Sequence, residues 1–496
     1  MWTDETLLDR LATADGSALA VVDGDVRMTV GELRDQSARV AAGLRARGVQ
    51  PGDVVAWQLP NWWEAVVFCW AVWRCGAISS PITPSLRAHE LNFILRQTNA
   101  RFIAVPGTFR GTDYRGLLNE AGYDGDVIIV RDEPLPDAEP GPDADTTVDD
   151  GALILWTSGT TAEPKGVVHT QQSLRVEADT IATAHDMRAG ESLLLPMPVT
   201  HVAGLTYGVL LPVTSAITAV LMDTWEPGRA LELLGAEAIN VMISTPVFMR
   251  TMIDHPAFGA TDRTPVRLFS LGGAGVAPAM VREGAAAFDC WCKRTYGSTE
   301  YPTLTTGRLG DTLDRDADTD GPLIGTCELR IVDPKTLADL EPGEPGELIV
   351  QGPEMFVGYL DAALNADAFT DDGWFRTGDL AVYDGEYLTI VDRLKDIIIR
   401  GGENISAQEV EAALVTHPAV TEAACVAFPD PVMGEKVCAF VIGAPGAAPT
   451  LDELRAHLLD RGLARFKLPE KLEVRTDLPR TASGKVQKAP LRDELR

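Results

Sequence analysis

The chain has 496 residues, about three times the size of a common single domain, so we expect more than one domain. Apolar residues make up 45% of it and charged residues 23%, a balance that excludes a disordered or fibrous protein. The 43 Lys and Arg against 72 Asp and Glu give a net charge of −29. Such a surface repels nucleic acid and anionic membranes, so neither is expected as a partner.

The chain shows no targeting or membrane-spanning signal. Its acidic start lacks the basic and apolar regions of a signal peptide, so we expect a cytoplasmic protein. Residues 204–222 carry no charge, but Pro212, Thr214 and Ser215 interrupt them and no basic cluster flanks them. We predict a buried helix, a turn and a core strand there.

The first 320 residues alternate short β-branched runs with helical periodicity, which predicts an α/β sheet flanked by helices. The Pro-, Asp- and Ala-rich residues 133–150 are predicted to form an exposed loop. The clearest predicted strands are residues 54–57, 128–130 and 217–222, and the clearest helices are residues 63–73 and 86–97.

After residue 320 the pattern becomes that of β-hairpins. A turn cluster at residues 341–346 precedes a predicted strand at 347–350, and Asp384-Gly385 joins two predicted strands. A small α+β unit then opens with a predicted helix at residues 406–416, whose Ser406 and Glu409 form a capping-box pattern.

The charge is divided unevenly along the chain. Residues 1–394 hold 29 basic and 57 acidic residues, whereas residues 395–496 hold 14 and 15. We therefore predict an N-terminal domain of residues 1–394 and a small C-terminal domain of residues 395–496. Residues 461–488 contain 8 basic and 3 acidic side chains, which favours either an anion-binding surface or an ordinary solvated face.

The most informative segment is residues 153–167, in which an apolar strand runs into a loop of Gly, Ser and Thr followed by Lys165. Backbone N–H groups and hydroxyls in such a loop can surround a polyphosphate, and the lysine adds charge. The loop lacks the spacing of a Walker A motif. Its predicted phosphate-binding residues are Thr157, Ser158, Gly159, Thr160, Thr161 and Lys165.

Residues 157–166 resemble the phosphate loop of the adenylate-forming superfamily, which includes acyl-CoA synthetases, luciferases and peptide-synthetase adenylation domains. Four further segments resemble the family's motifs and occur in the same order along the chain. The residues in these motifs are most similar to those of bacterial medium-chain and cyclohexanecarboxylate-type CoA ligases. These segments are Tyr296-Gly297-Ser298-Thr299-Glu300, Thr377-Gly378-Asp379-Leu380, residues 392–404 and Pro479-Arg480-Thr481-Ala482-Ser483-Gly484-Lys485.

The resemblance implies an α/β fold. Its large N-terminal domain would contain sheets flanked by helices and a small β-barrel-like portion. A small mobile α+β domain would carry a catalytic lysine, Lys485. The resemblance also implies ATP, Mg²⁺ and coenzyme A as cofactor or co-substrates.

In the N-terminal part, Glu300 suits Mg²⁺ because a carboxylate is a hard oxygen ligand, and Thr299 can hydrogen-bond the α-phosphate. Tyr296 offers a ring face to adenine, and the backbone of Gly273 and Ala274 allows close approach to the base. Gly297 and Ser298 complete this predicted nucleotide site.

In the C-terminal part, Asp379 can accept hydrogen bonds from both ribose hydroxyls, and Arg393 can bind ribose or phosphate. Lys485 is expected to bind the charge that develops at the α-phosphate. The resemblance implies that this domain rotates about Lys395 after adenylation. Gly401 and Gly402 would then line a pantetheine tunnel.

Residues 196–204 resemble the family segment that precedes the acyl pocket, with Thr200 in place of the usual aromatic residue. The resemblance implies that the acid binds near His201, which is interpreted as a gate or as an orienting group, with a purely structural histidine as the alternative. The predicted pocket residues carry no charge, which favours an apolar acid over an amino acid. Three further departures from the family pattern are Ala162 in the phosphate loop, the polar Ser298, and Ile399 with Gly401 where some aryl-CoA ligases have Lys. The predicted pocket residues are Leu205, Tyr207, Val247, Phe248, Gly273 and Ser298.

We therefore predict an AMP-forming acid–thiol ligase that makes an acyl-adenylate and passes the acyl group to coenzyme A. Three alternatives stay open at this point: transfer to a carrier protein, a non-catalytic nucleotide-binding scaffold, and adenylation of another oxyanion such as nitrite with transfer to an amine. A homodimer is also left open.

Overall fold

The computed structural model describes residues 4–158, 163–480 and 486–495. Contacts divide the chain into two compact units. Unit 1 comprises Met1–Ala317, Leu323–Cys327 and Gly352–Asp367, and unit 2 comprises Asp318–Pro322, Glu328–Gln351 and Ala368–Arg496. The predicted boundary between residues 394 and 395 lies within unit 2 and stays a prediction about which part of the chain moves.

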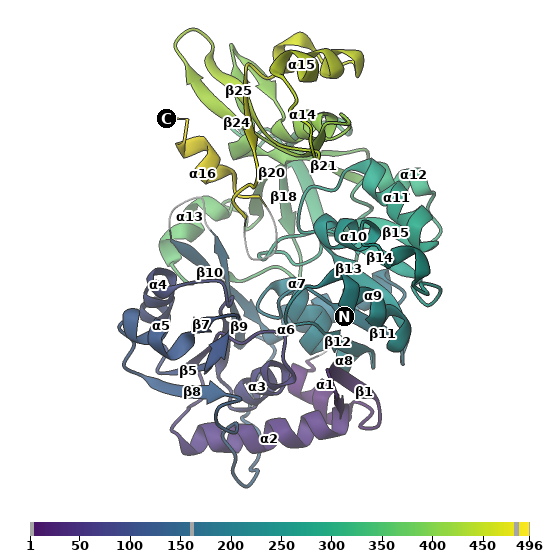
Figure 1. The fold of residues 1–496 in the computed structure, drawn as a ribbon. Helices are drawn as coiled ribbons and strands as arrows, with labels where there is room; N and C mark the ends of the chain where they lie inside the picture. Colours follow the sequence, from purple (N-terminus) through teal and green to yellow (C-terminus); the bar gives the residue numbers. More distant parts are fainter. Residues whose placement is uncertain (1–3, 159–162, 481–485, 496) are drawn as a thin grey trace. The chain divides into compact units, whose positions relative to one another are not determined.

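Two large sheets organise the described part of unit 1 (Figure 1). From edge to edge, the first sheet holds β19 (Gly358–Tyr359), β10 (Pro164–Thr170), β9 (Gly151–Ser158), β4 (Ile78–Pro81), β3 (Val54–Trp57), β5 (Phe102–Pro106) and β8 (Asp126–Val130). The second holds β16 (Thr305–Thr306), β15 (Trp291–Tyr296), β14 (Leu268–Leu271), β13 (Ile239–Ser244), β11 (Ser192–Leu195), β12 (Thr218–Leu221), β1 (Leu19–Asp23) and β2 (Val26–Thr29). A separate small hairpin joins β6 (Thr108–Phe109) to β7 (Thr112–Asp113).

Most neighbouring strands in both sheets are parallel, as the alternating pattern of strands and helices predicts. The strands pair antiparallel where β10 lies between β9 and β19, and at the edge strands β2 and β16.

Both sheets contribute one face to the same apolar core, and helices packed between the two sheets contribute the rest of it. Val55 and Trp57 of β3 face this core, whereas Ala56 between them faces the outer helices, as the two-residue period of a strand requires. Every residue from Glu64 to Arg74 is buried, which explains the continuous apolar run there. The longer helices of this core are α1 (Leu7–Thr13), α2 (Val30–Ala46), α3 (Trp63–Arg74) and α6 (Gln171–Ala184).

Outer helices cover the remaining faces of both sheets. The first sheet is covered by α4 (Ala88–Thr98) and α5 (Tyr114–Glu120). The second is covered by α9 (Pro227–Ala236), α10 (Pro246–Ile253) and α11 (Pro278–Phe288). Shorter helical segments are η2 (Phe258–Ala260), α12 (Leu313–Asp318), η3 (Ala362–Leu364) and α13 (Asn365–Ala368).

The uncharged residues 204–222 form buried helical turns followed by a core strand, as predicted. The turns are α7 (Val202–Leu205), the π-helical η1 (Thr206–Leu210) and α8 (Leu211–Thr214), and the strand is β12. Among the described helices, none combines the length and the apolar character that crossing a membrane requires.

Unit 2 contains an antiparallel meander of β17 (Glu328–Val332), β18 (Gly346–Gln351), β20 (Phe375–Tyr383) and β21 (Leu388–Arg393). The predicted hairpin around Asp384-Gly385 is the connection from β20 to β21. This meander lies in the part of the chain for which the family resemblance implies a small barrel-like portion. The mixed α/β class, with large sheets in the N-terminal part and a small α+β part at the C-terminus, is confirmed.

After the meander, a further sheet pairs β23 (Glu403–Ile405), β22 (Ile398–Arg400), β25 (Gly434–Gly443), β24 (Val420–Asp430) and β26 (Lys471–Arg475). Its two faces each support an apolar core. The helical segments here are η4 (Leu394–Asp396), α14 (Ala407–Leu414), α15 (Leu451–Asp460), η5 (Arg465–Lys467) and α16 (Lys488–Asp493).

The predicted capping box of α14 forms only in part. The Ser406 hydroxyl accepts a hydrogen bond from the Glu409 N–H, as a cap does. The Glu409 carboxylate does not return a bond to Ser406 and instead accepts one from Lys467 Nζ at 2.6 Å. Charge-assisted hydrogen bonds of this kind are stronger than the neutral bond to a backbone N–H that completes a capping box.

Candidate active site

The carboxyl ends of β11, β13, β14 and β15 lie at one edge of the second sheet because these strands are parallel and in register. Ligands of open parallel sheets bind outside this edge. Residues 196–201, 245–248, 272–277 and 297–302 follow these strands, and Glu300 is the one charged residue among them. The loops at this edge therefore contain a single carboxylate, that of Glu300, among mostly small and apolar side chains.

The predicted phosphate loop connects two paired strands of the first sheet. Thr157 on β9 lies opposite Lys165 on β10, and Ser158 lies opposite Pro164. Gly159, Thr160, Thr161 and Ala162 lie outside the described residues. The Lys165 Nζ lies 5.1 Å from the centre of the Tyr359 ring, in the geometry of a cation–π contact.

The residues that follow β15 form a tight turn that only glycine permits at its start. A Cβ atom on Gly297 would lie 1.9 Å from the Pro302 carbonyl oxygen. The Ser298 N–H donates to the Tyr301 carbonyl at 2.8 Å, and the Tyr301 N–H donates to the Ser298 hydroxyl at 3.1 Å. Ser298 thus closes the turn that presents Thr299 and Glu300.

A buried histidine from β10 fixes the backbone of this turn. His169 is fully buried and its Nε2 lies 2.8 Å from the Thr299 carbonyl oxygen, while its Nδ1 lies 3.1 Å from the Ser173 hydroxyl. Burial lowers the pKa of His169 to about 4, so the ring is neutral near pH 7. Because a carbonyl only accepts, Nε2 carries the proton and Nδ1 accepts from Ser173.

The Glu300 carboxylate is held on one side. Its Oε1 accepts a hydrogen bond from the Tyr359 hydroxyl at 2.8 Å, and its backbone carbonyl accepts from the Phe356 N–H at 2.8 Å. Among the described residues, Oε2 accepts no hydrogen bond and is available to a cation.

This arrangement fits Mg²⁺ bound together with phosphates. Among the described residues no cluster of His, Cys, Asp and Glu forms a complete metal cage. Mg²⁺ is commonly held by one or two carboxylates plus substrate phosphates and water, so a single carboxylate with one oxygen free of hydrogen bonds from the described residues suits it.

The predicted adenine site occupies the ends of β14 and β15. Gly273 has a φ of 71°, which favours glycine, and Tyr296 is the half-buried last residue of β15. A Cβ atom on the neighbouring Gly272 would lie 2.6 Å from the Thr295 carbonyl oxygen, so the loop that carries Gly273 and Ala274 passes directly against β15.

His201 presents an unsatisfied nitrogen at the same sheet edge. Among the described residues its buried Nε2 has no hydrogen-bond partner, and burial lowers its pKa, which favours the neutral ring. Burying a polar group without a partner is unfavourable, so such an atom points to a ligand or water.

The predicted acid-pocket side chains differ in what they contact. Leu205 and Tyr207 lie in the central core, and the Tyr207 hydroxyl lies 2.9 Å from His185 Nε2. Phe248 packs edge-on against Trp225 with ring centres 4.7 Å apart, whereas Val247 is 40% exposed. Their role in binding an acid stays a prediction.

In unit 2, Asp379 and Arg393 lie opposite one another on β20 and β21. The Arg393 Nε lies 3.2 Å from Asp379 Oδ1, and the aspartate is nearly buried while the arginine side chain is 44% exposed. Lys395 follows in η4, where burial, and then Arg393, lower its pKa. These three predicted residues are thus brought together.

Gly401 and Gly402 form the two-residue connection between β22 and β23. Both have positive φ, 60° and 92°, as a type I′ hairpin requires. A Cβ atom on Gly401 would lie 2.6 Å from Met433 Cε. Lys485 lies outside the described residues.

The basic side chains of residues 461–488 are largely engaged within unit 2. Lys467 pairs with Glu409, Arg475 with Glu494 and Lys488 with Glu411, at 2.6, 2.7 and 2.7 Å. Arg480 also pairs with Glu422. These ion pairs favour the solvated-face interpretation of this segment.

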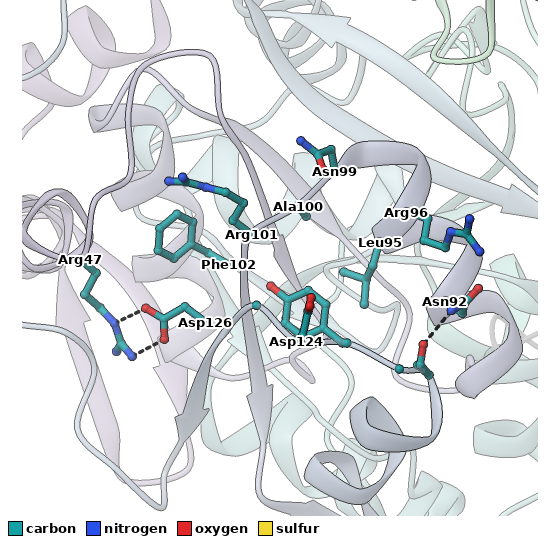
Figure 2. Close-up of a pocket in the computed structure, with 14 residues that line it drawn as sticks. Arg47, Asn92, Leu95, Arg96, Asn99, Ala100, Arg101, Phe102, Asp124 and Asp126 are labelled. Atoms are coloured by element: carbon teal, nitrogen blue, oxygen red, sulfur yellow. Dashed lines mark hydrogen bonds and ion pairs between the residues drawn. The ribbon is translucent and has the colours of Figure 1, made fainter.

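An open cavity of about 800 Å³ lies elsewhere in unit 1, beside the end of α4 and the start of β8. Figure 2 shows its lining, in which Arg47 donates two hydrogen bonds to Asp126. Arg101 lies 3.8 Å from Asp53. The cavity contains none of the predicted site residues, and two of its cations already face carboxylates.

Sequence reasoning missed His169 and Tyr359, which contact the Thr299-Glu300 pair from other strands. His169 gave a weak signal, because a histidine inside an apolar strand needs partners when buried. Tyr359 gave none, since its contact with Glu300 joins residues 59 positions apart.

Comparison with known proteins identifies two matching family models. The first, described as AMP-binding enzyme, matches residues 8–360, and the second, AMP-binding enzyme C-terminal domain, matches residues 409–485. The chain is 35% identical to a salicylyl-CoA synthase / salicylate adenylyltransferase from a Streptomyces species, over 99% of this chain and 93% of that protein. It is 32% identical to a medium-chain fatty-acid–CoA ligase from Escherichia coli strain K12, over 100% of this chain and 91% of that protein.

Among solved structures, ATP-bound MatB from Rhodopseudomonas palustris superposes with a TM-score of 0.91 at 28% identity, covering 99% of each chain.

Proposed function

Because the chain belongs to the family of AMP-binding enzymes, we propose that it uses ATP to adenylate an apolar organic acid and transfers the acyl group to coenzyme A. Its relatives include a salicylyl-CoA synthase and a medium-chain fatty-acid–CoA ligase, and the chain is an AMP-forming acid–thiol ligase. The apolar acid and coenzyme A as acceptor are the proposed parts.

The observation that supports adenylation most directly is the arrangement around Tyr359. The ammonium group of Lys165 lies over the Tyr359 ring, and the Glu300 carboxylate accepts a hydrogen bond from the Tyr359 hydroxyl through one of its two oxygens. Binding of ATP requires a cation that contacts the phosphate oxygens and a carboxylate that binds the accompanying divalent cation, and these two residues can supply them.

In the first reaction an oxygen of the substrate carboxylate attacks the α-phosphorus, and the bond to pyrophosphate breaks. Lys165 and the loop between β9 and β10 would bind the β- and γ-phosphates, and Thr299 the α-phosphate. Glu300 would hold Mg²⁺, which neutralises phosphate charge when bound. Asp379 would accept the ribose hydroxyls, and Lys485 would bind charge as it develops at the α-phosphate.

In the second reaction the thiol of coenzyme A attacks the acyl carbon, and AMP leaves. We propose that the residues after Lys395 change position between the two reactions. This change would withdraw Lys485 and would place Gly401 and Gly402 along the path by which the thiol of coenzyme A reaches the acyl-adenylate. Alternating positions of a small domain would let one site serve two different chemistries.

The acid would bind at the carboxyl edge of the second sheet. A neutral His201 has an unpartnered Nε2 there and can donate one hydrogen bond to the acid's carboxylate. An amino-acid substrate would need an anionic partner for its ammonium group, and Glu300 is the one carboxylate in these loops. An apolar aliphatic or aromatic acid therefore fits better.

The test is a panel of acids incubated with ATP, Mg²⁺ and coenzyme A, with pyrophosphate release measured and products identified by mass spectrometry. The panel contains salicylate, benzoate, octanoate, phenylalanine and nitrite. We expect release with one or more of the first three and a coenzyme A thioester as product. Release only with phenylalanine or nitrite, or an adenylate that never reaches coenzyme A, would contradict the proposal.

A further inference from the structure

Residues 354–360 connect the two halves of the predicted ATP site. The Leu360 and Val357 N–H groups donate to the carbonyls of Gly166 and Val168 on β10, at 2.8 and 2.9 Å. On the other side, the Phe356 N–H donates to the Glu300 carbonyl at 2.8 Å. One short segment thus contacts both the strand that carries Lys165 and the turn that carries Glu300.

Within this segment, Tyr359 contacts both charged groups directly. Its ring lies 5.1 Å from Lys165 Nζ, and its hydroxyl lies 2.8 Å from Glu300 Oε1. Asn365 fixes its backbone, since the Tyr359 N–H donates to Asn365 Oδ1 at 2.8 Å. The side chain thus contacts both charged groups while Asn365 holds its backbone.

We propose that Tyr359 is a positioning residue that keeps Lys165 and Glu300 from pairing with each other and aims the free oxygen of Glu300 at the cation that accompanies ATP. This inference rests on the proposed function. Neither Lys165 nor Glu300 forms an ion pair with a described residue, although their charges are opposite and both contact the same tyrosine.

The physical reason is competition between partners. A flexible lysine with no aromatic face beside it would move toward a nearby carboxylate, and the pair would neutralise both charges. The ring instead offers Lys165 a weaker attraction that phosphate oxygens can displace. The hydroxyl of Tyr359 donates to the Glu300 carboxylate at 2.8 Å and so holds its orientation.

The first test measures Mn²⁺ binding by electron paramagnetic resonance in the presence of a non-hydrolysable ATP analogue. Tyr359→Phe keeps the ring and removes the hydroxyl, and we expect about tenfold weaker Mn²⁺ binding, as is typical when the partner of a metal ligand is lost. The KM for MgATP should rise and the KM for the acid should stay unchanged.

Tyr114→Phe is the matched control, because it also removes a tyrosine hydroxyl bond, at 2.9 Å to the Pro84 carbonyl, outside the predicted site. It should leave Mn²⁺ binding unchanged. Equal Mn²⁺ binding by wild type and Tyr359→Phe would overturn the proposal.

The second test is a double-mutant cycle between Tyr359→Leu and Lys165→Gln, read out by the same Mn²⁺ titration. If Tyr359→Leu lets Lys165 capture Glu300, removing the lysine releases the carboxylate, so the double variant should lose less affinity than the product of the two single losses. Losses whose free energies simply add would overturn the proposed separation of charges.

The wild-type protein distinguishes the two proposals. Weak or absent binding of Mn²⁺ with the ATP analogue by wild type contradicts the proposed function and this inference together. Normal wild-type binding with unchanged variants overturns the role of Tyr359 alone.

Discussion

Glu300 keeps one carboxylate oxygen available, because its hydrogen bonds to described residues involve only the other carboxylate oxygen and the backbone carbonyl. Tyr359 bonds to Oε1 and Phe356 bonds to the backbone carbonyl, and Oε2 has no hydrogen-bond partner among the described residues. A carboxylate held in this way is a preformed ligand for a hard cation, because its orientation does not have to be fixed again when the cation arrives.

Glu300→Gln should therefore lower adenylate formation by roughly 10²–10³-fold, as the loss of an aimed charge in an active site does. The amide keeps the hydrogen bond from Tyr359 but is a neutral, weaker ligand. Pyrophosphate release at a series of Mg²⁺ concentrations checks this. The variant should need more Mg²⁺ for half-maximal rate, and an unchanged Mg²⁺ dependence would rule out the role.

Asp379 makes a different residue-scale contribution, because the structure pairs it with Arg393 across two strands. If its carboxylate also accepts the ribose hydroxyls, wild type should use ATP better than 2′-deoxy-ATP, and Asp379→Ala should lose that preference. The lost hydrogen bonds to a charged acceptor are each worth about 1.5–3 kcal/mol.

The comparison requires KM values for both nucleotides with each protein. Glu494→Ala is the control, since it also removes a carboxylate that pairs with an arginine in unit 2, at 2.7 Å from Arg475. A variant Asp379→Ala that still prefers ATP would show that the carboxylate does not bind the sugar.

At the scale of elements, the turn after β15 depends on glycine and on buried partners from other elements. Gly297 permits the close approach to Pro302, His169 fixes the Thr299 carbonyl, and Glu354 accepts from the Tyr301 hydroxyl at 2.9 Å. The turn is thus held by contacts on several sides, which suits a site that must keep its geometry.

Gly297→Ala tests how strictly this turn is fixed. A Cβ atom would meet a backbone oxygen at 1.9 Å, which side-chain motion cannot relieve, so the turn must move. We expect a loss of at least about 10²-fold in activity, the size of effect that a misplacement near 1 Å can cause. The melting temperature should also fall.

Gly235→Ala is its control. Gly235 lies in α9, where a Cβ atom would have no neighbour within 4 Å, and alanine favours helix by up to about 1 kcal/mol. Its activity should be unchanged and its stability equal or higher. If Gly297→Ala retained wild-type activity, the turn would not position the catalytic groups.

A buried carboxyl from α6 adds a pH dependence to the same region. Glu177 accepts a hydrogen bond from the Thr303 hydroxyl at 2.8 Å, and its Oε2 has no partner among the described residues. Burial raises the pKa of Glu177 to about 8, with Glu354 contributing in the same direction. The folded protein therefore binds a proton that the unfolded chain releases near its ordinary pKa.

The sign follows from this difference in protons. Between the ordinary glutamate pKa and about 8, the folded state holds more protons, so the free energy of unfolding falls as pH rises. Glu177→Gln mimics the protonated carboxyl and should remove this fall. Melting temperatures of wild type and Glu177→Gln from pH 5 to 9 check it, and parallel curves would contradict the assigned pKa.

Much of these elements could be predicted from sequence because their signals are local. Apolar runs with flanking turns predicted β3, β18 and α3, and Asp384-Gly385 predicted its hairpin. The motif around Glu300 predicted the centre of the candidate site, and its role there stays a prediction. The contacts of Tyr359 and His169 and the half-formed cap at Ser406 could not be predicted, because each depends on a partner far along the chain.

At the scale of the molecule, the two units divide the predicted chemistry. Unit 1 contains the predicted phosphate loop, Glu300 and the sheet edge at which we propose that the acid binds, while unit 2 contains Asp379, Arg393 and Lys485. The proposed change of position about Lys395 would let Lys485 act in the first reaction only.

Lys485→Ala should therefore lower adenylate formation by roughly 10²–10³-fold, as loss of one aimed charge does. Supplied with synthetic acyl-adenylate, the same variant should form thioester at near wild-type rate. Equal loss of both half-reactions would mean that the lysine is structural or serves both steps.

Lys395→Pro should show the opposite pattern, because proline restricts φ where the change of position is proposed. Its adenylation should persist while thioester formation from synthetic acyl-adenylate falls. Circular dichroism checks that the variant folds. A folded variant that forms thioester at the wild-type rate would show that the change of position does not depend on the backbone at Lys395.

In the proposed reaction, ATP is cleaved to an acyl-adenylate and pyrophosphate before any thiol takes part. Acid-dependent exchange of radiolabelled pyrophosphate into ATP, measured without coenzyme A, isolates this step. We expect exchange that requires Mg²⁺ and an apolar acid and is lost in Glu300→Gln. Absence of exchange with every acid, or release of ADP and phosphate in its place, would contradict it.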